Sequence, residues 1–264
     1  MKKLIITIII TLILITYSCN KKAEQKELFK DIRYKINTMI YQKDYENSIK
    51  YIDSVFFNKK ASLKKEELSF LIFKEAEIKY LYLNNYIDAY KEMKKIFKNN
   101  NLNNKNKIKL LKYLVELSET LDYQNFGIFL EKLNKSIKDK EILYRFINYL
   151  KKENKIKKLE EIVQKNELLS NDELQLLKLE ILIIKKQDKN IVLKFIDNYI
   201  KISKNQKIID DFKVKKIFYL EQSEKVDYKE LLNILTSIKS QKYNNLIKNK
   251  KIFYNKKISL YNKK

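Results

Sequence analysis

The 264-residue sequence contains no histidine, no proline and no tryptophan, and it has a single glycine and a single cysteine. Without histidine, neither a Ser-His-Asp nor a Cys-His catalytic arrangement can form, and zinc sites built on histidine or several cysteines are excluded. One glycine cannot form a phosphate-binding loop or a dinucleotide fingerprint. We therefore expect a protein that is not an enzyme and has no cofactor or metal. A carboxylate-based glycan hydrolase is the remaining catalytic alternative.

Strand signals are also lacking, because apolar and polar residues do not alternate between glycine or proline turns. Apolar residues recur instead at steps of three and four, as they do on one face of a helix. The clearest example brackets a turn at Asn84-Asn85, with apolar positions before and after it: Phe73, Ala76, Tyr80 and Leu83, then Tyr86, Ala89, Met93 and Ile96. The sequence therefore predicts an all-α fold with two helices joined by a tight turn at this point.

This pattern resembles a tetratricopeptide repeat, which has an aromatic residue, a small residue and a tyrosine before the turn and a tyrosine and an alanine after it. The same spacing gives six helix pairs in all, and we expect the second helix of each to begin near these positions: Tyr45, Tyr86, Tyr123, Ile156, Asn190 and Tyr228. The resemblance implies an α-solenoid over residues 28–238, in which stacked helical hairpins bury each other's apolar faces. A less regular α-solenoid and a helical bundle without a true repeat are the alternatives.

The N-terminal segment has a different character. Residues 4–17 are uncharged and predominantly apolar, too few for the about 20 residues that span a bilayer but enough for the core of a signal peptide. Ser18-Cys19 follows, and it resembles the lipobox of bacterial lipoproteins. The resemblance implies that residues 1–18 are removed, that Cys19 becomes the new N-terminus and is diacylated, with palmitate as the lipid, and that residues 19–27 form a polar tether. The alternative is an uncleaved N-terminal anchor. Both interpretations predict an exported protein attached to the cell membrane or outer membrane, on a periplasmic or surface face.

The charge is strongly positive, with a formal net value of +24. The bias is greatest at the end of the chain, where residues 231–264 contain nine lysines and no acidic residue. We expect residues 239–264 to form a basic helix that caps the solenoid, since the last apolar face needs a cover. The alternative is an amphipathic helix that contacts an anionic membrane surface. No nucleic-acid-binding motif occurs, so nucleic acid is not an expected partner.

A protein-binding groove is the site that the repeat resemblance implies, because stacked hairpins curve and their first helices line the concave face. On that face we place Arg33, Asn37 and Tyr41 in the first repeat, and Lys74 and Tyr82 in the second. Arg33 and Asn37 also resemble the start of the clamp by which some tetratricopeptide-repeat proteins hold a C-terminal carboxylate. The expected function is a scaffold in the bacterial cell envelope that holds a protein or peptide. The alternative is a surface lipoprotein that binds host molecules or polyanions through its basic face.

Overall fold

The computed structural model describes residues 24–99, 101–223 and 225–261. In these ranges the chain is predominantly helical and contains no strand, which confirms the all-α prediction. None of the described helices is both long and apolar enough to cross a membrane. The predicted signal peptide, Cys19 and the first half of the tether lie outside the described residues.

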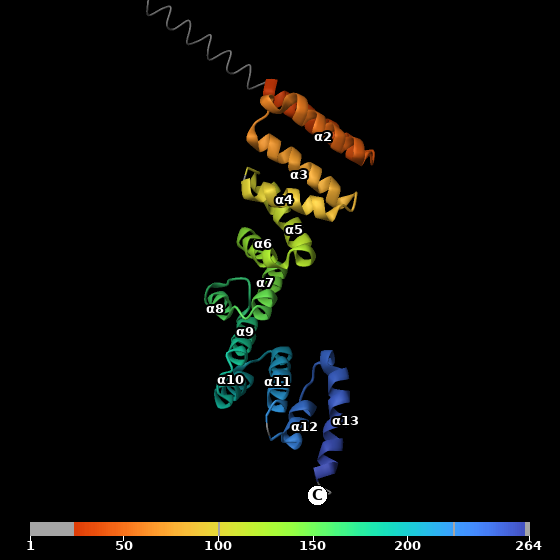
Figure 1. Cartoon of the computed structure of the whole chain (residues 1–264). Coiled ribbons are helices and arrows are strands. Elements are labelled where there is room, and N and C mark those ends of the chain that lie inside the picture. The colour runs from red at the N-terminus through yellow and green to blue at the C-terminus, as the bar shows by residue number, and fades with distance from the viewer. Residues whose placement is uncertain (1–23, 100, 224, 262–264) are drawn as a thin grey trace, which may run out of the picture. The chain divides into compact units, whose positions relative to one another are not determined.

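The described residues form two compact units, which divide between Ile142 and Leu143. In the first unit, the first described helix covers residues 24–41. It continues with α2 (Tyr45–Lys59), the short 3-10 helix η1 (Lys60–Ser62), α3 (Lys65–Leu81), α4 (Tyr86–Asn99), α5 (Asn104–Leu121) and α6 (Tyr123–Ser136). From α2 to α6, each helix packs against the next one along the chain (Figure 1). This successive packing is the arrangement expected of a helical repeat.

The second unit follows the same rule. Helix α7 (Lys140–Lys152) begins just before the boundary, and the rest of the unit comprises α8 (Ile156–Lys165), α9 (Asn171–Ile184), α10 (Lys189–Ile202), α11 (Gln206–Glu221), α12 (Tyr228–Thr236), the 3-10 helix η2 (Gln241–Tyr243) and α13 (Asn244–Tyr261). From α8 to α13, each α-helix packs on its neighbour in the sequence. At the start of α9, Ser170 and Glu173 form a reciprocal capping box, as their three-residue spacing indicates.

The helix starts agree with the sequence-based prediction. Five second helices begin at the predicted residue and α10 begins one residue earlier, at Lys189. The prediction that Leu83 extends the apolar face of the preceding helix is wrong, because α3 ends at Leu81 and Leu83 remains 37% exposed in the turn. The periodic apolar face alone therefore locates the hairpins but overestimates the length of this helix.

Four hairpin turns share one backbone conformation. A residue with φ between 52° and 60° follows the first helix of the pair: Lys43, Asn84, Asn154 and Lys186. In three of these turns the next N–H donates to the carbonyl five residues earlier: Asp44 to Met39, Lys155 to Leu150 and Gln187 to Leu182. This is the hydrogen bond of a Schellman cap, which satisfies a terminal carbonyl and reverses the chain. Here lysine and asparagine take the left-handed position that usually belongs to glycine.

Small residues allow the second helix of a hairpin to approach the first. Ser48 and Ala89 are the fourth residues of α2 and α4, and both are completely buried. In α6 the corresponding residue is Phe126, and the adjacent Gly127 is buried as well. A larger side chain in place of Ser48 or Ala89 would separate the two helices.

Candidate functional site

A groove of about 490 Å³ lies in the first unit, where the helix of residues 24–41, α3 and the start of α5 meet. These three helices are the first members of successive hairpins. Five cationic side chains line the groove, one or two from each hairpin: Arg33, Lys64, Lys74, Lys105 and Lys109. Three amides and two carboxylates also line it: Asn37, Asn103 and Asn106, with Glu66 and Glu67. We call this site the basic groove.

The structure brings together three of the five residues predicted for the partner-binding groove. Arg33, Asn37 and Lys74 line the basic groove, whereas Tyr41 and Tyr82 do not. Tyr41 is the last residue of its helix and is 89% exposed. Tyr82 follows the end of α3 and stacks on Tyr45, with ring centroids 4.4 Å apart. Each four-residue step rotates a side chain by about 40° around the helix, so two steps carry these tyrosines away from the groove.

Aromatic rings hold the Arg33 side chain at one end of the basic groove. The Arg33 guanidinium carbon lies 5.0 Å from the centroid of the Phe70 ring and 5.9 Å from that of Phe29. The two rings contact each other edge to face, with centroids 5.6 Å apart. Cation–π contacts of this kind fix a guanidinium without neutralising it. Arg33 is exposed, so its charge is available to an anionic ligand.

A buried carboxylate organises two further cations. Glu77 on α3 has only 5% of its side chain exposed, and it pairs with Lys74 at 2.6 Å and with Lys109 from α5. The Tyr113 hydroxyl donates a third hydrogen bond to Glu77, at 3.0 Å. Lys74 and Lys109 both line the basic groove, so Glu77 sets their positions from beneath it.

The electrostatics of this cluster favour the ionised form of Glu77. Burial raises the pKa of the Glu77 carboxyl, but hydrogen bonds and charge interactions with Lys109 and Lys74 outweigh it and keep that pKa below its ordinary value. Burial and the adjacent Glu77 raise the pKa of the Tyr113 hydroxyl. Glu77 is therefore a carboxylate and Tyr113 a neutral donor near neutral pH.

A second tyrosine links the same two helices. Tyr80 on α3 donates a 2.7 Å hydrogen bond to Glu116 on α5, and its ring lies edge to face with Tyr113, 5.1 Å between centroids. Burial, followed by the bond to Glu116, raises the pKa of Tyr80 to about 12. With Glu77, these contacts tie α3 to α5 and give the basic groove a fixed base.

Sequence reasoning missed Phe70, Glu77 and Lys109. The three-residue spacing of Lys74 and Glu77 is a signal for an ion pair on one helix face, but it does not reveal that Glu77 is buried. Lys109 adds a positive charge to the groove from α5, the first helix of the third hairpin. The lining of the basic groove therefore suits an anion. No group of three or more potential metal ligands occurs among the residues that the structure describes.

The C-terminal helix α13 is basic and contains no acidic residue. Its inner face packs on α12, and Tyr254 is completely buried and donates a 2.5 Å hydrogen bond to Glu221. Lys250 pairs with the same carboxylate at 2.6 Å. On the outer side, Ile252 is 64% exposed and Leu260 52%. The helix therefore covers the last hairpin and still presents a face to solvent.

Comparison with known proteins yields no matching family model, no matching curated protein and no matching solved structure.

Proposed function

We propose that this chain is a membrane-anchored, tetratricopeptide-like lipoprotein that acts as a binding scaffold in the bacterial cell envelope. In this proposal the basic groove receives an acidic segment of a partner protein. The observation that carries the proposal is the set of five cationic side chains, contributed by three consecutive hairpins, around one groove of about 490 Å³.

Four features of the basic groove support an acidic peptide as the ligand. Lys74 and Lys109 are held in place by Glu77, so binding an anion does not require them to lose side-chain freedom. Arg33 and Lys105 are exposed at the rim, where uncompensated charge accelerates the approach of an acidic partner. Asn103 and Asn106 can donate hydrogen bonds to peptide carbonyls. A groove of this volume fits a few residues of an extended segment better than a folded surface.

The membrane attachment rests on the N-terminal sequence. Fourteen uncharged residues precede Ser18-Cys19, and Cys19 is the only cysteine of the chain. Lipidation of Cys19 would attach the basic groove to a membrane through the short tether and would place it beside envelope proteins. Attachment raises the local concentration of groove and partner, so even a weak peptide interaction becomes effective.

The proposal is tested by crosslinking in intact cells. A photoactivatable amino acid at Asn37 should capture a partner, and the crosslinked partner peptide, identified by mass spectrometry, should be rich in Asp and Glu. Arg33→Glu combined with Lys105→Glu should abolish capture, because both charges reverse at the rim while the Glu77 cluster is untouched. Purified protein should bind a fluorescein-labelled hexaglutamate peptide, and the double variant should bind it at least tenfold more weakly.

The matched control is Lys157→Glu combined with Lys201→Glu, two exposed lysines of the second unit that produce the same change in net charge. If this control loses capture as fully as the groove variant, binding follows total charge and the groove is not the site. Membrane attachment is tested separately by labelling cells with a palmitate analogue. The unmodified protein should incorporate the label and Cys19→Ser should not. A protein that incorporates no label in the unmodified form is not a lipoprotein.

The exposed face of α13 favours a second candidate, a surface lipoprotein that binds polyanions. Lys248, Lys251 and Lys256 are exposed on this helix, which contains no acidic residue. Replacing all three by glutamine should lower the salt concentration that elutes the protein from heparin. On intact cells, added protease should also remove the protein. Unchanged elution or complete protection from protease would exclude this function.

A further inference from the structure

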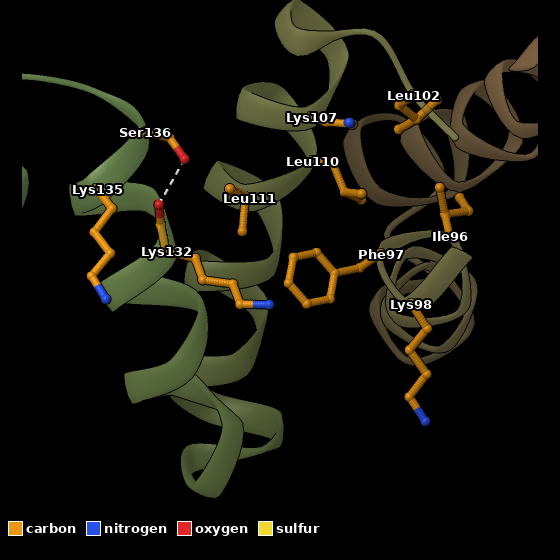
Figure 2. Close-up of a pocket in the computed structure, with 10 residues that line it drawn as sticks. All are labelled: Ile96, Phe97, Lys98, Leu102, Lys107, Leu110, Leu111, Lys132, Lys135 and Ser136. Atoms are coloured by element: carbon orange, nitrogen blue, oxygen red, sulfur yellow. Dashed lines mark hydrogen bonds between the residues drawn. The ribbon is translucent and has the colours of Figure 1, made fainter. Parts of the chain in front are cut away.

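A second hollow of the first unit has a lining of different character from the basic groove. It has a volume of about 620 Å³ and is bounded by the ends of α4 and α6 and by α5 (Figure 2). Five apolar side chains and four lysines line it, with Ser136: Ile96, Phe97, Leu102, Leu110 and Leu111, then Lys98, Lys107, Lys132 and Lys135. We call it the lysine-rimmed pocket.

The apolar part of the lysine-rimmed pocket is continuous with the core. Ile96, Leu102, Leu110 and Leu111 are all buried, with exposed fractions between 2% and 6%. Phe97 is half-buried, and its ring packs edge to face on Phe129 with centroids 5.2 Å apart. None of these five side chains can form a hydrogen bond, so the floor suits a hydrocarbon chain.

The rim is positive and has no acidic member among the described residues that line it. Lys132 reaches from α6 toward the Phe97 ring on α4, with its Nζ atom 4.4 Å from the ring centroid (Figure 2). Lys107 extends from the first turn of α5. Lys135 is already paired with Glu131 at 2.9 Å, and Lys98 extends away from the other lining side chains (Figure 2). Lys107 and Lys132 are therefore the cations that remain for an added anion. The basic groove differs, since two carboxylates line it.

We propose that the lysine-rimmed pocket binds a single-chain amphiphilic anion, namely the carboxylate of a free fatty acid. The alkyl chain lies over Phe97 and the buried leucines, and the carboxylate lies between Lys107 and Lys132. The volume falls within the range of about 300–1,000 Å³ that is usual for small-molecule pockets. An apolar floor with a cationic rim matches both parts of such a ligand, whereas a fully polar anion would leave the floor uncovered and an uncharged lipid would leave the lysines without a partner.

The test is isothermal titration calorimetry of the full mature protein with decanoate below its micelle concentration. We expect saturable one-to-one binding that weakens by at least tenfold for butanoate, since the floor contributes in proportion to chain length. We also expect decan-1-ol to bind at least tenfold more weakly than decanoate. Lys107→Gln combined with Lys132→Gln should weaken decanoate binding at least tenfold. Lys157→Gln combined with Lys201→Gln, with the same loss of charge in the second unit, should leave it within twofold.

Several results would overturn the proposal. These are the absence of saturable decanoate binding, equal affinity for butanoate and decanoate, and unchanged affinity in the Lys107/Lys132 variant. Binding to phosphatidylglycerol vesicles without binding to free decanoate would assign the lysines to a membrane surface instead. Neither substituted lysine lines the basic groove, so this test does not depend on the outcome for the acidic peptide.

Discussion

At the scale of single residues, Glu77 is the side chain on which the base of the basic groove depends. It is nearly buried and holds Lys74 and Lys109. We expect Glu77→Gln to lower the free energy of unfolding by about 2 kcal/mol, because removing one partner leaves the others unpaired while their partial exposure reduces the cost. Urea unfolding followed by circular dichroism measures this. The exposed Glu66→Gln is the control and should change stability by less than about 0.5 kcal/mol. Equal effects of the two substitutions would contradict the prediction.

Asp122 gives the first unit a defined response to acid. Its Oδ2 atom accepts hydrogen bonds from Lys94 and from the Tyr90 hydroxyl, both at 2.7 Å, and these contacts lower the pKa of Asp122 from 3.8 to about 2. A carboxyl with a lowered folded-state pKa stabilises the protein above its unfolded pKa and loses that effect as the pH falls. Asp122→Asn should therefore destabilise by about 1 kcal/mol at pH 6, discounted for exposure.

The difference between Asp122→Asn and the unmodified protein should shrink between pH 4 and pH 2, because over this range the Asp122 carboxyl of the unfolded chain takes up a proton while that of the folded protein remains largely ionised. Urea midpoints at pH 6, 4, 3 and 2 measure this trend for both proteins. A difference that stays constant over this range would show that Asp122 acts through its shape and hydrogen bonds alone, without a contribution from its charge.

The residues of the groove were predictable only where helical geometry keeps them on one face. Arg33 and Asn37 are one step apart and share the groove, as does Lys74. Tyr41 and Tyr82 lie two steps from the first member of each series, and the accumulated rotation of about 80° removes them. Glu77 was not predictable, because its burial depends on Lys109 and Tyr113 from another hairpin. Single-helix periodicity contains no information about such contacts.

At the scale of elements, the hairpin starts were predictable because turn residues and apolar periodicity change together at each of them. Tyr86 directly follows Asn84-Asn85, and Tyr123 directly follows Asp122, the residue that joins α5 to α6. The helix ends were less predictable. Leu83 continues the apolar period, yet α3 stops at Leu81 because Asn84 takes a left-handed conformation two residues before the next helix. Backbone geometry at the turn decides this point.

The left-handed turn residues lead to a prediction about glycine. Lys43 has φ of 60°, a conformation that is unfavourable for a residue with a Cβ atom. We expect Lys43→Gly to raise the free energy of unfolding by about 0.5 kcal/mol, because relief of that strain exceeds the added flexibility of the unfolded chain. Thermal unfolding measures the change. The adjacent Gln42→Gly should instead lower stability, since Gln42 does not have a positive φ. Stabilisation by both substitutions would contradict the explanation.

At the scale of the whole molecule, the boundary between the two units, at residues 142 and 143, could not be predicted from the sequence. The boundary falls inside α7, a regular amphipathic helix with no glycine or proline. Composition reveals linkers that are irregular and polar, and this boundary is neither. The division emerges only from which helices pack together.

Separate cores in the two units predict separate local stabilities. Ile52 is fully buried in the first unit and Leu235 in the second. We expect Ile52→Ala to cost about 2–4 kcal/mol and to speed amide hydrogen exchange at least tenfold in the core helices of residues 24–142 only. Leu235→Ala should do the same for residues 143–261 only. Mass spectrometry of peptides from the exchanged protein measures both, and acceleration of both units by either substitution would show a single cooperative unit.

Neighbour-to-neighbour packing of the helices has a consequence for how the chain reaches its folded state. From α2 to α6, and again from α8 to α13, each helix finds its main partner within the next few tens of residues. Low contact order of this kind favours fast folding, because only short loops are closed. A chain that emerges from a ribosome or an export channel one end first can therefore complete each hairpin as its residues appear. Little apolar surface then stays exposed before its packing partner appears, which limits the time available for aggregation.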